Sequence, residues 1–163
     1  MKAPIFPDTT DDPIPPGIAV GKVAIQAHDF GGSIPLPHYG HKRPNVDYYQ
    51  SNLMQHNIVL CDVLAQKHKI KFYDEREQGK GADACNSMRL AYELKTLENL
   101  RSKGIKPEDE ATLIVLMGNC NGQNKSQYVI HFWAMMGLFF KTVVTFYFVG
   151  GHTKMIADCI VAL

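Results

Sequence analysis

The sequence predicts an α/β fold, a mixed five-stranded sheet flanked by helices. Short apolar or alternating runs of strand length recur along the chain, and in its second half they alternate with segments of helical periodicity. At 163 residues, 45% apolar and 20% charged, the chain is long enough for one domain with its own core. The formal net charge of +1 offers no global attraction for nucleic acid, which leaves only a local basic groove open.

Prolines and aspartates crowd residues 1–17, which we expect to form an irregular arm. Alternating apolar residues over 18–30 predict the first strand, with Asp29 near its end. Residues 34–45 contain three prolines and are expected to form a loop. The next two strands, clearest at 57–64 and 69–73, are separated by a short turn and should form an antiparallel hairpin.

The segment Ala82–Lys103 has the clearest helical periodicity in the chain. Asp83 is the expected N-cap, Gly104 the expected stop, and Arg89 and Glu93 can pair one turn apart. The apolar residues at helical spacing, which should face the core, are Ala84, Met88, Ala91, Leu94 and Leu97.

The fourth strand, Thr112–Met117, is an apolar run of the kind that is buried on both faces of a sheet. It is followed by the polar turn GNCNGQNK and by Ser126, the expected cap of a helix that extends to Phe140. A fifth strand, Val143–Val149, comes next. The chain then begins a third helix at Met155, which it cuts short.

Residues 132–149 form an apolar run long enough to cross a bilayer, so a membrane-associated protein is one alternative. Lys141 interrupts the run, and the residue types change there from helix formers to β-branched and aromatic residues. We therefore favour a buried helix followed by a buried strand and expect no membrane partner.

The four cysteines are widely spaced, which argues against a zinc knuckle. Together with the lack of a signal peptide, this spacing favours an intracellular location, the nucleus included, over a secreted one.

The element order is strand, strand, strand, helix, strand, helix, strand, helix, which is the order of the ribonuclease H-like fold. We assign this fold to residues 18–163, with an incomplete C-terminus. The first, fourth and fifth strands should be parallel, and the first and fourth should be neighbours. The ends of these two strands and the start of the last helix then meet at one point, where the sequence has Asp29, Gly118 and Asp158.

Three segments resemble an uncharacterised family of domains from transposon-derived eukaryotic proteins. The family has an aspartate in its first strand, then D-N-C-x-G-Q-N-K-N, then G-H-T-K-F-x-x-D. The corresponding segments here are residues 27–30 (AHDF), 118–125 (GNCNGQNK) and 151–158 (GHTKMIAD). The resemblance spans about residues 23 to 163, and the two later motifs are specific only when taken together.

The family is similar to integrases and cut-and-paste transposases, which implies metal-dependent phosphodiester chemistry on DNA. Asp29 and Asp158 would be catalytic ligands of Mg²⁺ or Mn²⁺, which need carboxylate oxygens. The family's middle aspartate is replaced by Gly118, so metal affinity should be weak or lost and the domain inactive. The sequence offers two further sets of candidate residues. The accessory positions are Glu75, Asn119 and His152, and the phosphate-binding positions are Asn124, Lys125 and Lys154.

Two further functions stay open. One is a non-catalytic domain that binds nucleic acid or another partner through the asparagine-rich loop and its lysines. The other is a different phosphate-binding enzyme, although the spacing of Gly118, Gly122 and Lys125 departs from that of a P-loop.

Overall fold

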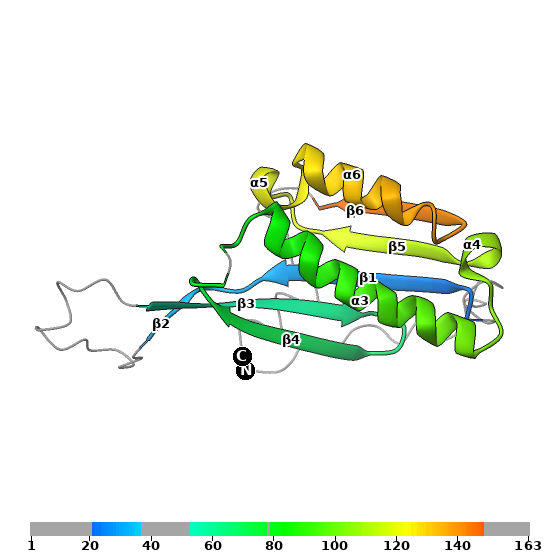
Figure 1. Cartoon of the computed structure of the whole chain (residues 1–163), viewed down its shortest axis with the longest axis horizontal. Helices are drawn as coiled ribbons and strands as arrows, with labels where there is room; N and C mark the ends of the chain where they lie inside the picture. The colour runs from blue at the N-terminus through cyan, green and yellow to red at the C-terminus, as the bar shows by residue number, and fades with distance from the viewer. Residues whose placement is uncertain (1–20, 37–52, 78, 149–163) are drawn as a thin grey trace, which may run out of the picture.

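The computed structural model describes residues 21–36, 53–77 and 79–148, which form a mixed α/β fold (Figure 1). Within these residues a six-stranded sheet has the order β2-β3-β1-β5-β6, and β4 pairs with β3 on the side of β3 that is opposite to β1. The α/β class is therefore confirmed, with one strand more than expected. The strands are β1 (Val23–Phe30), β2 (Ile34–Leu36), β3 (Leu53–Asp62), β4 (Lys67–Asp74), β5 (Thr112–Met117) and β6 (Thr142–Tyr147).

The strand directions agree with the expected arrangement. β3 runs antiparallel to both β1 and β4, so the predicted hairpin is confirmed. β5 lies beside β1 and parallel to it, and β6 is parallel to β5. The carboxyl ends of β1, β5 and β6 consequently lie at one edge of the sheet, on which chemistry in open α/β sheets is usually placed.

The extra strand, β2, lies in the segment predicted to be a loop. Residues 34–36 pair with residues 53–55 of β3, and β1 pairs with residues 58–62 of the same strand. β4 occupies one side of β3 along residues 55–62. β1 and β2 must therefore both lie on the other side of β3, where β2 continues the line of β1. The loop prediction was wrong here because a proline such as Pro35 is tolerated where its missing N–H faces no partner strand.

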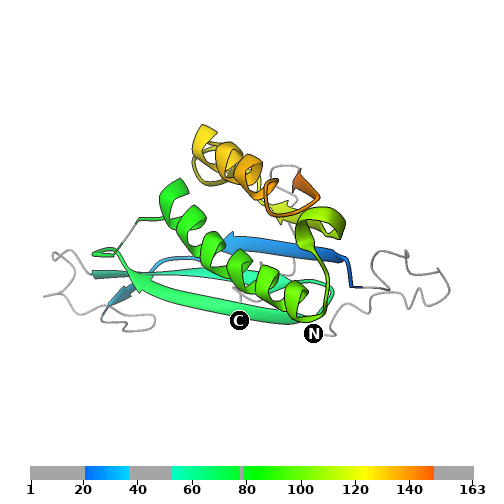
Figure 2. The ribbon, with the colours of Figure 1, turned by 45° about the vertical axis from the view of Figure 1, so that its right-hand side comes forward.

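Two helices, α3 (Ala82–Ser102) and α6 (Gln127–Met136), cover one face of the sheet (Figures 1 and 2). The main core lies beneath them, where Leu97 and Leu100 of α3 and Phe132 and Trp133 of α6 pack around Val115 of β5. Two single-turn helices flank β5 in the chain. These are α4 (Pro107–Glu110) and α5 (Asn121–Asn124).

Helix α3 has the expected length but turns a different face to the core. Ala91 and Leu94 are exposed, whereas Arg89 and Glu93 are completely buried. The N-cap is Gly81, with Asp83 in the first turn, so the predicted cap and part of the predicted stripe were wrong. The stop was correct, because Gly104 takes a φ of 77°, which glycine adopts without strain.

The apolar run is divided between two elements. Helix α6 begins after Ser126, whose Oγ accepts a hydrogen bond from the backbone N–H of Val129 at 3.4 Å, as expected of the cap. The helix ends at Met136, four residues before the predicted Phe140. The run then turns, passes Lys141 and continues as β6. No helix in the described part of the chain is both long and apolar enough to cross a membrane.

Candidate functional site

Asp29 and Gly118 lie side by side at the carboxyl ends of β1 and β5. The register pairs His28 with Met117, so the residues that follow them, Asp29 and Gly118, are level with one another. Gly118 is buried, and a Cβ atom built on it would lie 3.8 Å from Oδ1 of Asp29. The same Oδ1 accepts a hydrogen bond from the backbone N–H of Phe30 at 2.9 Å. The expected approach of these two strand ends is therefore present.

Asn124 holds the loop that follows Gly118 against β1. Its Nδ2 donates to the carbonyl oxygen of Gly118 at 2.9 Å, and its Oδ1 lies 3.2 Å from Nε2 of His28. Its backbone carbonyl accepts from the hydroxyl of Tyr147, at the end of β6, at 3.1 Å. Asn124 is only 2% exposed. Because its amide is used inside the protein, we do not retain Asn124 as a phosphate ligand.

These contacts determine which nitrogen of His28 is protonated. Nδ2 of Asn124 is the donor to a carbonyl, so its Oδ1 is an acceptor and must face an N–H. Nε2 of His28 therefore carries the proton, while Nδ1 has no hydrogen-bond partner among the described residues. Burial lowers the pKa of His28 to about 3, and the positive charge of Arg89 adds to this shift. The imidazole is thus neutral at physiological pH.

A cysteine, a histidine and an asparagine meet here without forming a nucleophilic triad. Sγ of Cys85 lies 3.3 Å from Nε2 of His28, the same nitrogen that faces Asn124. A proton relay needs the thiol on one ring nitrogen and the orienting group on the other. Burial also raises the pKa of Cys85 to about 11, and its side chain is fully covered. The cluster is structural.

A buried polar network lies beneath the site on the helix-facing side of β1. Nη2 of Arg89 donates to Oε1 of Glu93 and Oε1 of Gln26, and Nε2 of Gln26 donates to Oε2 of Glu93 at 3.2 Å. Burial raises the pKa of Glu93, while the charge of Arg89 opposes this shift. The guanidinium carbon lies 5.0 Å from the ring centre of Trp133, which gives the remaining N–H groups an aromatic face.

Lys80, in the connection from β4 to α3, reaches the same strand end. Its Nζ donates to the carbonyl oxygen of Gly31, two residues after Asp29. Burial lowers the pKa of Lys80, and the negative charge of Asp29 opposes that shift. Sequence reasoning missed this residue, because a lysine between two glycines in a loop has no pattern that distinguishes it from a solvated one.

The other predicted site residues are dispersed. Asp29 is level with Val59 and hence with Ile70 of β4, so Glu75 lies five residues farther along, about 16 Å, and two strands away. Glu75 therefore does not belong to this site. Exposed Asn119 and Lys125 flank the loop, and Nζ of Lys125 lies 5.3 Å from the ring centre of Tyr147. The remaining predicted residues lie outside the described part of the chain, namely His152, Lys154 and Asp158.

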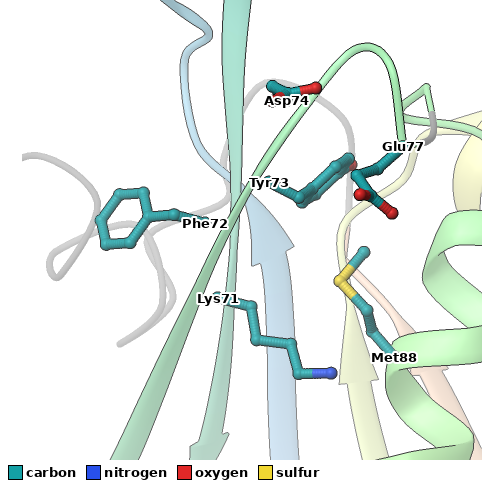
Figure 3. A pocket seen from close by; sticks show the side chains of 6 residues that line it. All are labelled: Lys71, Phe72, Tyr73, Asp74, Glu77 and Met88. Atoms are coloured by element: carbon teal, nitrogen blue, oxygen red, sulfur yellow. The ribbon is translucent and has the colours of Figure 1, made fainter.

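Two of the hollows on the described surface lie beside α3. One, of about 690 Å³, lies between the starts of α3 and α6 and is lined by Gly81, Gly122 and Ser126 among others. It adjoins the candidate site because Gly81 follows Lys80 and Gly122 belongs to the loop after Gly118. The other, of about 540 Å³, lies on β4, where Tyr73 and Glu77 face Met88 of α3 and Phe72 points to the opposite side (Figure 3). It does not share residues with the candidate site.

Comparison of the chain with family models, with curated proteins and with solved structures found no match.

Proposed function

We propose that this chain is a ribonuclease H-like domain of transposase or integrase ancestry whose metal-dependent phosphodiester chemistry has been lost. The observation that carries the proposal is the position of Gly118 beside Asp29 at the ends of two parallel strands. The strand order and directions, with an antiparallel hairpin on one side of β1 and two parallel strands on the other, also support it.

The proposed loss follows from the ligand chemistry of hard cations. Mg²⁺ and Mn²⁺ are held by oxygen ligands, carboxylates above all, and a pair of such ions would stabilise the attacking and leaving oxygens of phosphoryl transfer. Asp29 supplies one carboxylate at this point, and Gly118 supplies none. Asp158 remains the second proposed ligand, contributed by the chain beyond the described residues.

The test is a cleavage assay of the unmodified protein on single-stranded and double-stranded DNA and on RNA, with Mg²⁺ or Mn²⁺. We expect negligible cleavage. The Asp29→Asn variant, purified in parallel, measures contaminating nuclease. Metal-dependent cleavage by the unmodified protein that Asp29→Asn abolishes would overturn the proposed loss of activity.

A second candidate function is nucleic-acid binding without cleavage. It is favoured by Lys125, which is exposed and packs over Tyr147, the residue level with Met117 in the pairing of β5 with β6. Phosphate contacts from lysines would make binding fall with rising salt. In fluorescence anisotropy, Lys125→Ala should weaken DNA binding and reduce the salt dependence, whereas Lys141→Ala, before the start of β6, should leave both unchanged. Equal effects of the two substitutions would contradict a specific role for Lys125.

A further inference from the structure

We propose that the outer edge of β4 is a docking site for an extended segment of another protein, which adds one strand to the sheet. The segment that fits this edge has an acidic residue at every second position and an apolar residue between. Three features of β4 carry the inference: its open backbone edge, a row of lysines on one face and exposed apolar side chains on the other. The inference goes beyond the proposed function and does not depend on it.

The backbone of β4 offers a long and regular edge. Its eight residues all pair with β3, from Lys67 opposite Asp62 to Asp74 opposite Gln55, and no bulge interrupts this register. In the described sheet β3 is the sole neighbour of β4. Every second residue of such a strand directs its N–H and C=O groups away from the sheet, where an added strand can bind them. Residues 67–70 are exposed, so a partner can reach this edge.

Alternate positions of β4 share one face of the strand, and three of them are lysines, namely Lys67, Lys69 and Lys71. This face lies on the side of α3, because Lys69 and Lys71 are level with Leu60 and Ile58, which pack against that helix. None of the three lysines forms an ion pair with another residue in the described part of the chain. Successive lysines are about 7 Å apart along the strand, so alternate acids of an added strand can meet them one by one.

The opposite face of β4 carries exposed apolar side chains. Ile70 is 43% exposed and Phe72 is 59% exposed. Figure 3 shows Phe72 pointing away from the side on which Lys71 lies. Large apolar residues on an open edge strand favour association, and apolar residues of an added strand would cover both side chains.

Charge decides which strand fits this edge. In symmetric antiparallel pairing with a second copy of β4, the two rows of lysines would lie opposite one another on one face, and like charges in that position are destabilising. A single-stranded nucleic acid would meet the lysines but leave the backbone edge and the apolar face unused. A strand that alternates acidic and apolar residues matches all three features, because opposite charges and apolar pairs across strands are both favourable.

The probe is a fluorescently labelled peptide of about eight residues in which glutamate alternates with valine, and its binding is measured by anisotropy at about 0.15 M salt. We expect this glutamate peptide to bind the unmodified protein, and failure to bind would overturn the inference. A second peptide has lysine in place of glutamate and should not bind. A third keeps the side chains but has N-methyl groups on its backbone amides, which removes its N–H donors. Equal binding of the methylated and unmethylated glutamate peptides would overturn the addition of a strand.

Charge reversal tests the row of lysines. Lys69→Glu with Lys71→Glu should weaken binding of the glutamate peptide by about tenfold or more and should allow the lysine peptide to bind. The control, Lys106→Glu with Lys141→Glu, makes the same change in net charge near β6, at the opposite edge of the sheet, and should change neither. Equal binding of the glutamate peptide by all three proteins would overturn the inference. Loss of both peptides after reversal would also overturn it, because the reversed edge keeps its backbone groups.

The apolar face is tested with Phe72→Ala, which should weaken binding of the glutamate peptide severalfold. Phe146→Ala, at a similarly exposed phenylalanine of β6, should leave binding unchanged. Equal affinities of the two variants would contradict the role of Phe72. A thymidine oligonucleotide is the final competitor and should not displace the peptide. Displacement by the oligonucleotide that Lys69→Glu with Lys71→Glu abolishes would show that these lysines serve phosphates, and the inference would fail.

Discussion

The Cα atom of Gly118 faces the carboxylate of Asp29 closely enough that an added Cβ would lie 3.8 Å from Oδ1. This is an ordinary van der Waals separation, and the φ of Gly118 is not in the positive range that would strain a larger residue. An aspartate side chain can therefore begin at this position without displacing the backbone. Two strand ends that are far apart in the sequence would then present adjacent carboxylates.

The loop that carries Gly118 depends on Asn124. Asn124→Leu leaves the carbonyl of Gly118 without its Asn124 donor and the N–H of His28 with only the weak acceptor Sγ of Cys85, each at a cost of about 1–3 kcal/mol. We expect the free energy of unfolding to fall by about 2–4 kcal/mol in urea denaturation. The control Asn121→Leu changes an exposed residue of the same loop and should cost less than about 1 kcal/mol. Similar losses for both variants would contradict the bridging role of Asn124.

The buried His28 predicts a loss of stability in acid. Its pKa is about 3 in the folded protein and 6.5 when unfolded, so between these values the unfolded chain binds more protons. Its contribution to stability is therefore complete above pH 6.5 and declines as the pH falls toward 3. Between pH 7.5 and 5 the decline should be about 2 kcal/mol.

Unfolding curves of the unmodified protein and of His28→Gln, measured across this pH range, isolate the effect. The difference in unfolding free energy between the two proteins should shrink by about 2 kcal/mol on acidification. The variant His131→Gln, at an exposed position, is the matched control for the substitution itself. A constant difference between the unmodified protein and His28→Gln would show that His28 is not held neutral by burial.

The buried ion pair of α3 predicts strong non-additivity. Arg89→Met alone leaves Glu93 as an uncompensated buried acid and should cost about 3–5 kcal/mol in chemical denaturation. Replacing both, by Arg89→Met and Glu93→Leu, removes that penalty and should be less destabilising than either single change. Additive losses would mean that the two charges do not depend on one another in the folded protein.

Much of the fold could be predicted because its elements differ in periodicity and are separated by glycine or charge. The run from Phe132 onward is instructive, since Lys141 and the β-branched residues after it indicated a helix and then a strand, as the structure has it. The expected burial of that strand was wrong, because β6 has a single neighbour, β5, in the described sheet and its residues are partly or fully exposed. The proximity of Asp29 and Gly118 followed from the strand order of the expected ribonuclease H-like arrangement, in which the first and fourth strands are parallel neighbours and end at the same edge.

The polar interior could not be predicted from the same patterns. Arg89 and Glu93 were expected to pair one turn apart, but their burial depends on contacts with Gln26 and Trp133 that the sequence pattern does not show. One signal was available in β1, a central strand of the sheet in which the polar residues Gln26 and His28 alternate with apolar ones. Lys80 had no such signal, because a tertiary contact alone brings this loop to the end of β1.

The most direct test of the account is calorimetric Mn²⁺ binding by the unmodified protein and by Gly118→Asp. The substitution should raise Mn²⁺ affinity by about tenfold or more, because it adds a carboxylate beside Asp29. Gly118→Asn, which has the same shape without the charge, and the double variant Gly118→Asp with Asp29→Asn should both lack the gain. Equal Mn²⁺ affinity in all four proteins would contradict the account, because these residues would then never have formed a metal site.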